Sequence, residues 1–255
     1  MQVVILSGGN GSRLSEENFL KPKPMIEIGG LPILWHIMKY FSVYGHNDFL
    51  ICLGYKQYMV KNFFADYFLY TQDIEINIKN NSIKILNEQK DDWSIKLIDT
   101  GVETNTAGRL KRVSKYLNDE FFLVYGDSLG NINLKKEYDF FKEKNNILTL
   151  CATRFSTQKG VIDVDDDFVI TSFREKSDED VTYVNSGYMI CNKKILDFID
   201  DDNSAFDKNV FPKLFKIGEA NSYKHNGEWR MVEKMNDIKE LNKLWEDKNA
   251  FWKIW

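Results

Sequence analysis

The sequence predicts an α/β fold with a doubly wound, mostly parallel sheet. Two short, continuous apolar segments, residues 2–6 and 48–55, are typical of strands that are buried on both faces. Each is followed by a segment with helical apolar spacing, residues 33–45 and 56–68. Strands that alternate with helices in this way indicate βαβ units, which place parallel strands side by side.

The chain also contains two expected β-hairpins. Residues 74–87 alternate apolar and polar side chains around Asn80 and Asn81, which predicts two strands joined by a turn. Residues 160–173 contain three consecutive aspartates and predict a second hairpin that extends the main sheet. Further strands are expected at 93–101, 121–128, 146–154 and 183–192, a helix at 108–117, and a C-terminal helix from 238 followed by an aromatic end.

Length, composition and charge limit the class of protein. The 255 residues, 43% of them hydrophobic, suit one domain spanning residues 1–255. A net charge of −4 argues against a nucleic-acid partner. Cys52, Cys151 and Cys191 stand in separate apolar segments, which favours buried free thiols in a reducing cytoplasm. No signal-peptide pattern or membrane-spanning apolar run is present, so we expect a cytoplasmic protein without a membrane partner.

A glycine-rich, basic loop follows the first predicted strand. Gly8, Gly9 and Gly11 let the backbone approach a ligand and turn its N–H groups toward an anion. Arg13 offers a planar fork of donors to phosphate oxygens, and Lys23 stands between two prolines that restrict its backbone. The spacing fits neither the dinucleotide fingerprint nor the P-loop. At the carboxyl edge of a parallel sheet, the pattern favours phosphate binding over a solvated turn.

The opening segment resembles a known family. Residues 8–25, GGNGSRLSEENFLKPKPM, resemble the signature of sugar-phosphate nucleotidyltransferases, and the similarity covers nearly the whole chain. Residues 21–45, KPKPMIEIGGLPILWHIMKYFSVYG, resemble the branch of glucose-1-phosphate cytidylyltransferases. The resemblance implies a Rossmann-like sheet of the nucleotidyltransferase type with β-hairpin insertions. It also implies transfer of CMP from CTP to a small phosphorylated acceptor, with release of pyrophosphate and Mg²⁺ as cofactor.

The same resemblance implies a nucleotide site. Arg13 and Lys23 are the expected catalytic cations on the phosphates, and Arg109 is expected at the edge of the cytosine. Asp127 follows a buried strand and a glycine, a position that suits a metal ligand or a helix cap. The full expected nucleotide set is Leu6, Gly8, Gly9, Asn10, Gly11, Ser12, Arg13, Lys23, Gly54, Tyr55, Thr100, Gly101, Gly108, Arg109 and Asp127.

A second metal ligand is expected late in the chain. The family has a Trp-x-Pro-Met-Asp segment there, and this chain reads GEWRMVEKMND over residues 227–237. Glu233 stands where the family has aspartate, and its extra methylene shifts the carboxylate. Asp237 is the other candidate, or it opens the last helix.

The acceptor side departs from the family pattern. Ser177 replaces a proline, Ser186 a glycine after Asn185, and Ser128 a glycine after Asp127. The nucleotide side is almost unaltered, which predicts the same nucleotide with a changed acceptor. The chain resembles a cytidylyltransferase of capsular phosphoramidate biosynthesis that joins CTP to L-glutamine phosphate. The expected acceptor contacts are Ser128, Glu175, Lys176, Asn185, Ser186, Gly187 and Arg230, whose positive charge suits a carboxylate.

Several alternatives stay open on the sequence. Glucose 1-phosphate is the alternative acceptor, giving CDP-glucose for surface polysaccharide, and UTP or dTTP are alternative nucleotides. An inactive nucleotide-binding regulator is a further possibility, supported by the change to Glu233. The aromatic end, residues 244–255, predicts packing on another subunit or on the chain's own core, and we expect a homo-oligomer. His36 lies among apolar residues of a predicted helix and is expected to be a packed histidine.

Overall fold

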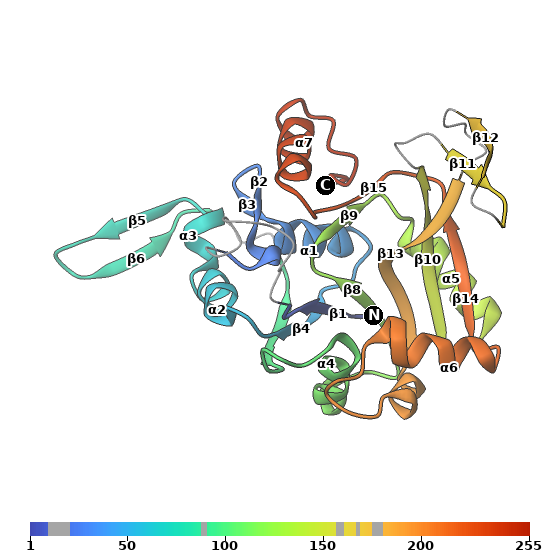
Figure 1. Cartoon of the computed structure of the whole chain (residues 1–255). Helices are drawn as coiled ribbons and strands as arrows, with labels where there is room; N and C mark the ends of the chain where they lie inside the picture. Colours follow the sequence, from blue (N-terminus) through green and yellow to red (C-terminus); the bar gives the residue numbers. More distant parts are fainter. Residues whose placement is uncertain (10–20, 88–90, 157–160, 167–168, 175–180) are drawn as a thin grey trace.

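The structure is a computed structural model that describes residues 1–9, 21–87, 91–156, 161–166, 169–174 and 181–255. A seven-stranded sheet lies at its centre (Figure 1). Four of the six strand pairings in this sheet are parallel, and the two that involve the strand Val181–Asn192 are antiparallel. The order across the sheet is β14 (Ala220–His225), β10 (Leu148–Ser156), β13 (Val181–Asn192), β8 (Glu120–Tyr125), β1 (Gln2–Ser7), β4 (Asp48–Leu53) and β7 (Ser94–Asp99).

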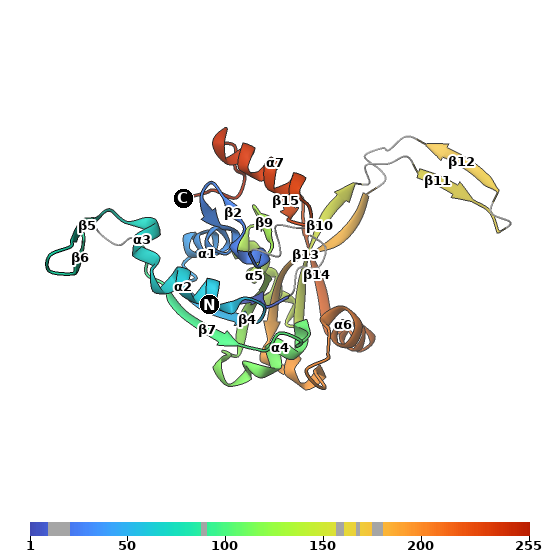
Figure 2. The same ribbon diagram turned by 60° about the vertical axis from the view of Figure 1, so that its left-hand side comes forward.

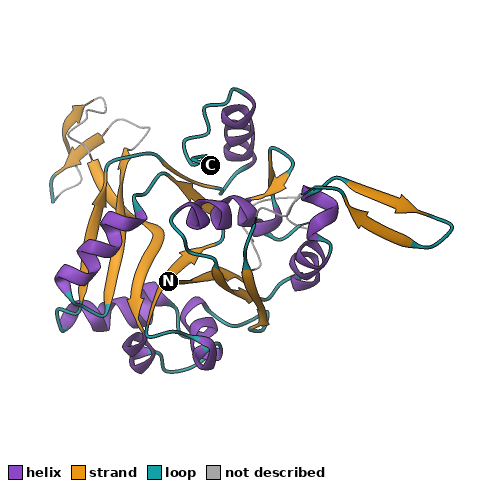
Figure 3. Cartoon of the chain, turned by 180° about the vertical axis from the view of Figure 1, so that it is seen from behind, coloured by secondary structure: helices purple, strands orange, loops and turns teal. Residues whose placement is uncertain are grey.

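Helices cover both faces of this sheet (Figure 3), and two hydrophobic cores result. Val3 and Ile5 of β1 face the core that includes α1 (Ile33–Val43) and α5 (Leu134–Lys144). Val4 and Leu6 face the core that includes α4 (Thr106–Arg112) and α6 (Phe211–Lys216). Because both faces of the strand are buried, its sequence is continuously apolar, and the predicted α/β fold is confirmed.

The predicted helices form, with shifted ends. The helix expected at 33–45 is α1, which stops before Gly45, whose φ of 77° needs a glycine. The helix expected at 56–68 divides at Asp66 into α2 (Gln57–Ala65) and α3 (Tyr67–Thr71). The helix expected at 108–117 is α4, which begins two residues earlier and ends at Arg112. The short elements are η2 (Lys23–Met25), η3 (Ser114–Tyr116), η4 (Lys193–Phe198), η5 (Phe206–Val210), β2 (Glu27–Ile28), β3 (Leu31–Pro32), β9 (Ser128–Gly130) and β15 (Trp229–Met231).

Two hairpins project from opposite ends of the body (Figure 2). The first, β5 (Ile74–Asn77) with β6 (Ser82–Ile85), is the predicted hairpin, and Asn81 has a left-handed φ of 49° in its turn. The second consists of β11 (Val161–Val164) and β12 (Ile170–Arg174) and forms a separate sheet. The prediction that it extends the main sheet was wrong, because β14 and β8 already occupy the free edges of β10 and β13.

The aromatic end packs on the chain's own core, which is one of the two expected alternatives. It follows α7 (Met235–Glu246), which begins three residues before the predicted position. Trp252 is fully buried and donates its indole N–H to Nδ1 of His36 at 3.3 Å. Trp255 meets Trp35 edge to face. His36 is a packed histidine as predicted, and burial lowers its pKa to about 4, so the ring is neutral at pH 7.

A buried carboxyl group lies between α5 and the sheet. Glu137 is fully buried, and neither of its carboxyl oxygens has a hydrogen-bond partner within the described residues. The Thr149 hydroxyl and the Asn221 amide nitrogen are likewise buried and unpartnered in that part of the chain, and the two residues pair across β10 and β14. Burial raises the pKa of Glu137 to about 8, so this carboxyl is protonated at neutral pH.

Two further predictions concern composition. Cys52, Cys151 and Cys191 are all buried and free, as expected. In the part of the chain that the structure describes, no helix is both long enough and apolar enough to cross a membrane.

Candidate active site

A cavity of about 340 Å³ opens at the carboxyl ends of β1 and β8. This is the edge at which parallel α/β sheets bind ligands, because strand ends and helix starts meet there. Its walls come from segments that are far apart in the sequence. The lining residues are Leu6, Ser7, Gly8, Gly9, Lys23, Pro24, Thr104, Asn105, Thr106, Arg109, Tyr125, Gly126, Asp127 and Met231.

Lys23 and Asp127 meet in this cavity. Nζ of Lys23 donates to Oδ2 of Asp127 at 3.2 Å, and the two side chains are 17% and 22% exposed. Lys23 opens η2, with an extended proline before it and Pro24 after it, which fixes its backbone as the sequence indicates. Asp127 follows Gly126, whose N–H donates to the Leu6 carbonyl and joins the ends of β1 and β8.

Arg109 lies buried beside the cavity and joins three strand ends. It is 3% exposed, and burial lowers its pKa below the ordinary arginine value, which still leaves the guanidinium charged. Its guanidinium donates to oxygen atoms of residues at or just after the carboxyl ends of β1, β4 and β7. The acceptors are Gly101 O at 2.6 Å, Gly8 O at 2.9 Å, Thr100 Oγ1 at 2.9 Å, Val102 O at 3.1 Å and Leu53 O at 3.2 Å.

The expected glycines differ in what they accommodate. A Cβ on Gly8 would overlap the guanidinium of Arg109, and a Cβ on Gly54 would lie 2.5 Å from the Gly8 carbonyl oxygen. A Cβ on Gly108 would likewise lie 2.5 Å from the Asp202 carbonyl oxygen. Among the residues that the structure describes, nothing lies within 4 Å of a Cβ placed on Gly9. Close packing around Arg109 therefore requires Gly8 and Gly54, whereas the described residues do not constrain Gly9 in this way.

This difference predicts that alanine substitutions at the neighbouring positions 8 and 9 change the free energy of unfolding by different amounts. Gly8→Ala should lower the free energy of unfolding by about 1–3 kcal/mol, because the new methyl group must displace a guanidinium held by five hydrogen bonds. Gly9→Ala should change it by less than about 0.5 kcal/mol. Denaturant unfolding of the two variants beside the wild type measures both, and equal losses would contradict the packing argument.

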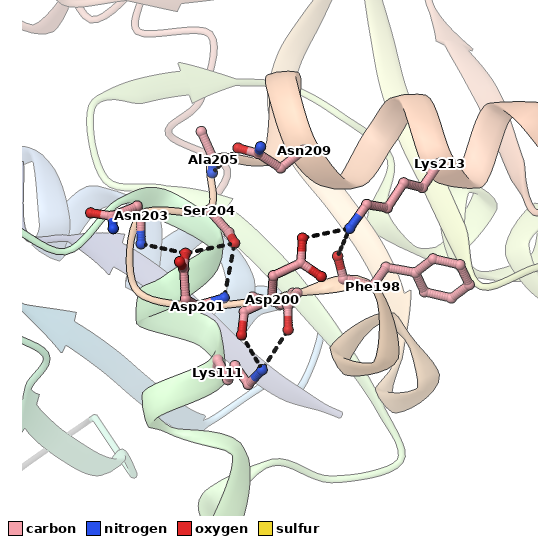
Figure 4. Close-up of polar contacts among 10 residues, drawn as sticks. Lys111, Phe198, Asp200, Asp201, Asn203, Ser204, Ala205, Asn209 and Lys213 are labelled. Carbon is pink, nitrogen blue, oxygen red and sulfur yellow. Dashed lines mark hydrogen bonds and ion pairs between the residues drawn. The ribbon is translucent and has the colours of Figure 1, made fainter.

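The wall formed by residues 104–106 is held from behind by the loop at 199–205. The Asn105 N–H donates to the Asp202 carbonyl at 2.8 Å, and Ser204 O accepts the N–H groups of Ala107 and Gly108. This backbone cap explains why α4 begins earlier than its sequence pattern indicates. Figure 4 shows Lys111 and Lys213 converging on Asp200 from α4 and α6.

The acceptor-side serines are buried in a backbone network. The Ser128 hydroxyl donates to Ser186 O at 3.2 Å, and the Trp229 indole donates to the same oxygen at 2.8 Å. Neither serine has any exposed surface. Gly187 has a φ of 80°, and its N–H donates to Oδ1 of Asn185. These hydroxyls therefore support the backbone beside the cavity and do not line it.

Arg230 lies outside the Lys23–Asp127 cavity. It is the middle residue of β15, so its side chain points to the face opposite that of Met231, which lines the cavity. Arg230 lines a second cavity of about 320 Å³ with Glu228, Asp237 and residues of α7. The structure does not bring Arg230 together with the other expected site residues, and its role in acceptor binding stays a prediction.

The family model described as nucleotidyl transferase matches residues 2–248. The chain belongs to the nucleotidyl transferase family. This membership confirms the prediction that the chain is an enzyme of the nucleotidyltransferase class.

Curated relatives and solved structures agree with this assignment. Glucose-1-phosphate cytidylyltransferases from Salmonella typhi and Salmonella typhimurium are each 40% identical to this nucleotidyl transferase over 257 residues, covering 100% of both chains. The crystal structure of HddC from Yersinia pseudotuberculosis complexed with GMP-PN superposes with a TM-score of 0.68, at 24% identity, covering 96% of this chain and 99% of that one. At that identity the likeness shows the fold alone.

The residues of this nucleotidyl transferase fit a divalent cation. Asp127 is the carboxylate of the cavity, and the Lys23 ammonium already places a positive charge beside it. Mg²⁺ in phosphoryl-transfer sites binds through one or two carboxylates together with substrate phosphates. The described residues hold no cluster of three or more His, Cys, Asp or Glu side chains.

The two candidates for a second carboxylate have different surroundings. The Val232 N–H donates to the Asp127 carbonyl at 2.9 Å, which brings the backbone of Glu233 next to the metal candidate. Asp237 accepts the backbone N–H groups of Glu233 and Lys234, both at 2.8 Å. Asp237 therefore caps the start of α7, the structural alternative that the sequence left open, and Glu233 stays the predicted second ligand.

The remaining expected residues fall into two groups, and the cavity has further lining residues that were not expected. Thr100 and Gly101 bind the Arg109 guanidinium, and the Tyr55 N–H donates to the Gly8 carbonyl. The cavity is also lined by residues that the sequence analysis did not predict, namely Thr104, Asn105, Thr106 and Met231. The sequence signal for this segment was the pair of polar residues Thr104 and Asn105 directly before α4, which is typical of a helix start. Asn10, Gly11, Ser12, Arg13, Glu175 and Lys176 lie outside the described residues, and their roles stay predictions.

Proposed function

We propose that this enzyme is a cytidylyltransferase that transfers CMP from CTP to a small phosphorylated acceptor and releases pyrophosphate, with Mg²⁺ as cofactor. The observation that carries the proposal is the Lys23–Asp127 pair in the cavity at the ends of β1 and β8. Transfer of a nucleotidyl group between two anionic reactants requires a cation in the site and a carboxylate that binds a metal ion, because the negative charges of the reactants must be neutralised. The full-length relatives that are cytidylyltransferases support CTP as the nucleotide.

The residues suggest how the reaction proceeds. An acceptor phosphate oxygen attacks the α-phosphorus, the bond from that phosphorus to the bridging oxygen breaks, and pyrophosphate leaves. Lys23 would balance the charge that develops on the phosphate oxygens. The backbone at Gly9 would admit the triphosphate, and Arg109 with Thr100 would form the base side of the cavity. Asp127, with Glu233 as the second ligand, would hold Mg²⁺, which would supply positive charge to neutralise the phosphates.

Glucose 1-phosphate is the better supported acceptor. Two relatives that share the full length of the chain at 40% identity are named for it. The buried hydroxyls of Ser128 and Ser186 bond to backbone, and Arg230 lines another cavity, so none of these side chains lines the Lys23–Asp127 cavity. L-Glutamine phosphate is the second candidate, favoured by the concentration of the sequence changes on the acceptor side.

The acceptor is tested by measuring pyrophosphate release with CTP and Mg²⁺. We expect turnover with α-D-glucose 1-phosphate. Turnover with L-glutamine phosphate and none with glucose 1-phosphate would reverse the order of the two candidates. A comparison of Arg230→Ala with the neighbouring exposed Lys234→Ala would then show whether Arg230 reaches the acceptor, since only a contact residue should raise the KM for glutamine phosphate.

A further inference from the structure

The Lys23–Asp127 contact places two roles on one carboxylate. Oδ2 of Asp127 accepts from the Lys23 ammonium at 3.2 Å, and the same carboxylate is the expected ligand of the divalent cation. A Mg²⁺ ion binds a carboxylate oxygen at about 2.0–2.1 Å. A doubly charged cation at that distance and an ammonium ion on the same carboxylate would repel each other strongly, because both side chains lie mostly out of water.

We infer that Lys23 and the divalent cation compete for Asp127, so that metal binding requires Lys23 to exchange its carboxylate partner for a nucleotide phosphate. This inference rests on the proposed function and adds a thermodynamic coupling to it. The triphosphate gives the ammonium a new anionic partner, and the freed carboxylate then accepts the metal. By linkage, the nucleotide raises the affinity for the metal by the same factor by which the metal raises the affinity for the nucleotide.

The arrangement around the pair supports an exchange over a simple fixed ion pair. Lys23 lies on η2, a single turn held between prolines, so its backbone stays in place while its flexible side chain changes partner. Gly9 lines the same cavity as Lys23, and the phosphates would approach there. Short movement of the Nζ atom within one cavity is therefore sufficient.

The competition predicts a gain of metal binding on removing the lysine charge. Mn²⁺ titrated without nucleotide into the full chain, with free Mn²⁺ measured by electron paramagnetic resonance, should bind Lys23→Met roughly 5- to 150-fold more tightly than the wild type. Lys23→Arg keeps the charge and should bind Mn²⁺ as weakly as the wild type. Asp127→Asn in the Lys23→Met background should abolish the gain. Equal Mn²⁺ affinity of the wild type and Lys23→Met would overturn the inference.

A second measurement tests the other half of the exchange. With EDTA present, Asp127→Asn should bind CTP more tightly than the wild type, because Lys23 no longer has to leave a carboxylate to reach the phosphates. Unchanged or weaker CTP binding by Asp127→Asn would contradict the exchange. Turnover of CTP by the wild type tests the proposed function, whereas the two binding experiments test the competition. An active enzyme whose Mn²⁺ and CTP affinities do not change in the variants would therefore contradict the competition alone.

Discussion

Lys23→Ala is expected to lower kcat for pyrophosphate release by about 10²–10³-fold with little loss of stability. The ammonium lies 3.2 Å from Asp127 inside the cavity, where it can act on charge that develops in the transition state. Its side chain makes a mostly buried ion pair and packs little apolar surface, so the fold should persist. Steady-state kinetics with CTP, supported by a thermal melt, measures both effects.

The chain provides a matched control two residues away. Lys21 belongs to the same Lys-Pro-Lys-Pro segment, and its ammonium pairs with Glu27 in solvent. Lys21→Ala should therefore leave kcat within about threefold of the wild type, since exposed ion pairs contribute little. A loss of activity in Lys21→Ala as large as that in Lys23→Ala would remove the special role of Lys23.

Glu137→Gln is expected to change the pH dependence of stability. The pKa of Glu137 is about 8 in the folded chain and near 4.5 in a solvated one, so the folded state holds the proton more tightly. The unfolded state therefore releases this proton first, and stability falls as pH rises from about 4.5 to about 8, then levels off. The full loss is on the order of 5 kcal/mol, and the glutamine variant, which cannot ionise, should not show it.

Urea unfolding from pH 5 to pH 9 tests this prediction. Glu143, on the same helix, is exposed and is the control, so Glu143→Gln should keep the wild-type slope. An identical pH slope in the wild type and in Glu137→Gln would show that the buried carboxyl does not govern the dependence.

Periodicity predicted the first half of the fold well. The apolar runs of β1 and β4 are those of strands buried on both faces, and the apolar pattern of α1 is that of a helix buried on most sides. The sequence patterns did not indicate α5, α6 or β14. α5 is rich in lysine and glutamate, and its one buried acid, Glu137, looks like another solvent-facing residue. The boundary of α4 depends on Ser204, a contact from nearly a hundred residues away.

Some residues of the candidate site were also predictable from the local sequence, and others were not. Lys23 and Asp127 were predicted from the short segments around them, and the structure brings the two side chains into contact. A Cβ on Gly8 or Gly54 would overlap Arg109 or the backbone beside it, so both glycines make room for Arg109, and their expected ligand contacts stay predictions. Arg230 faces away because β15 alternates its side chains, and the strand's register is set by its pairing with β9, which no local pattern shows.

The central claim is tested most directly by measuring pyrophosphate release from CTP, UTP, dTTP, GTP and ATP in parallel, with Mg²⁺ and glucose 1-phosphate or L-glutamine phosphate. The account predicts release with CTP, at a kcat/KM roughly tenfold or more above that of any other triphosphate. Release with another triphosphate in preference to CTP, or with none of them for either acceptor, would contradict it.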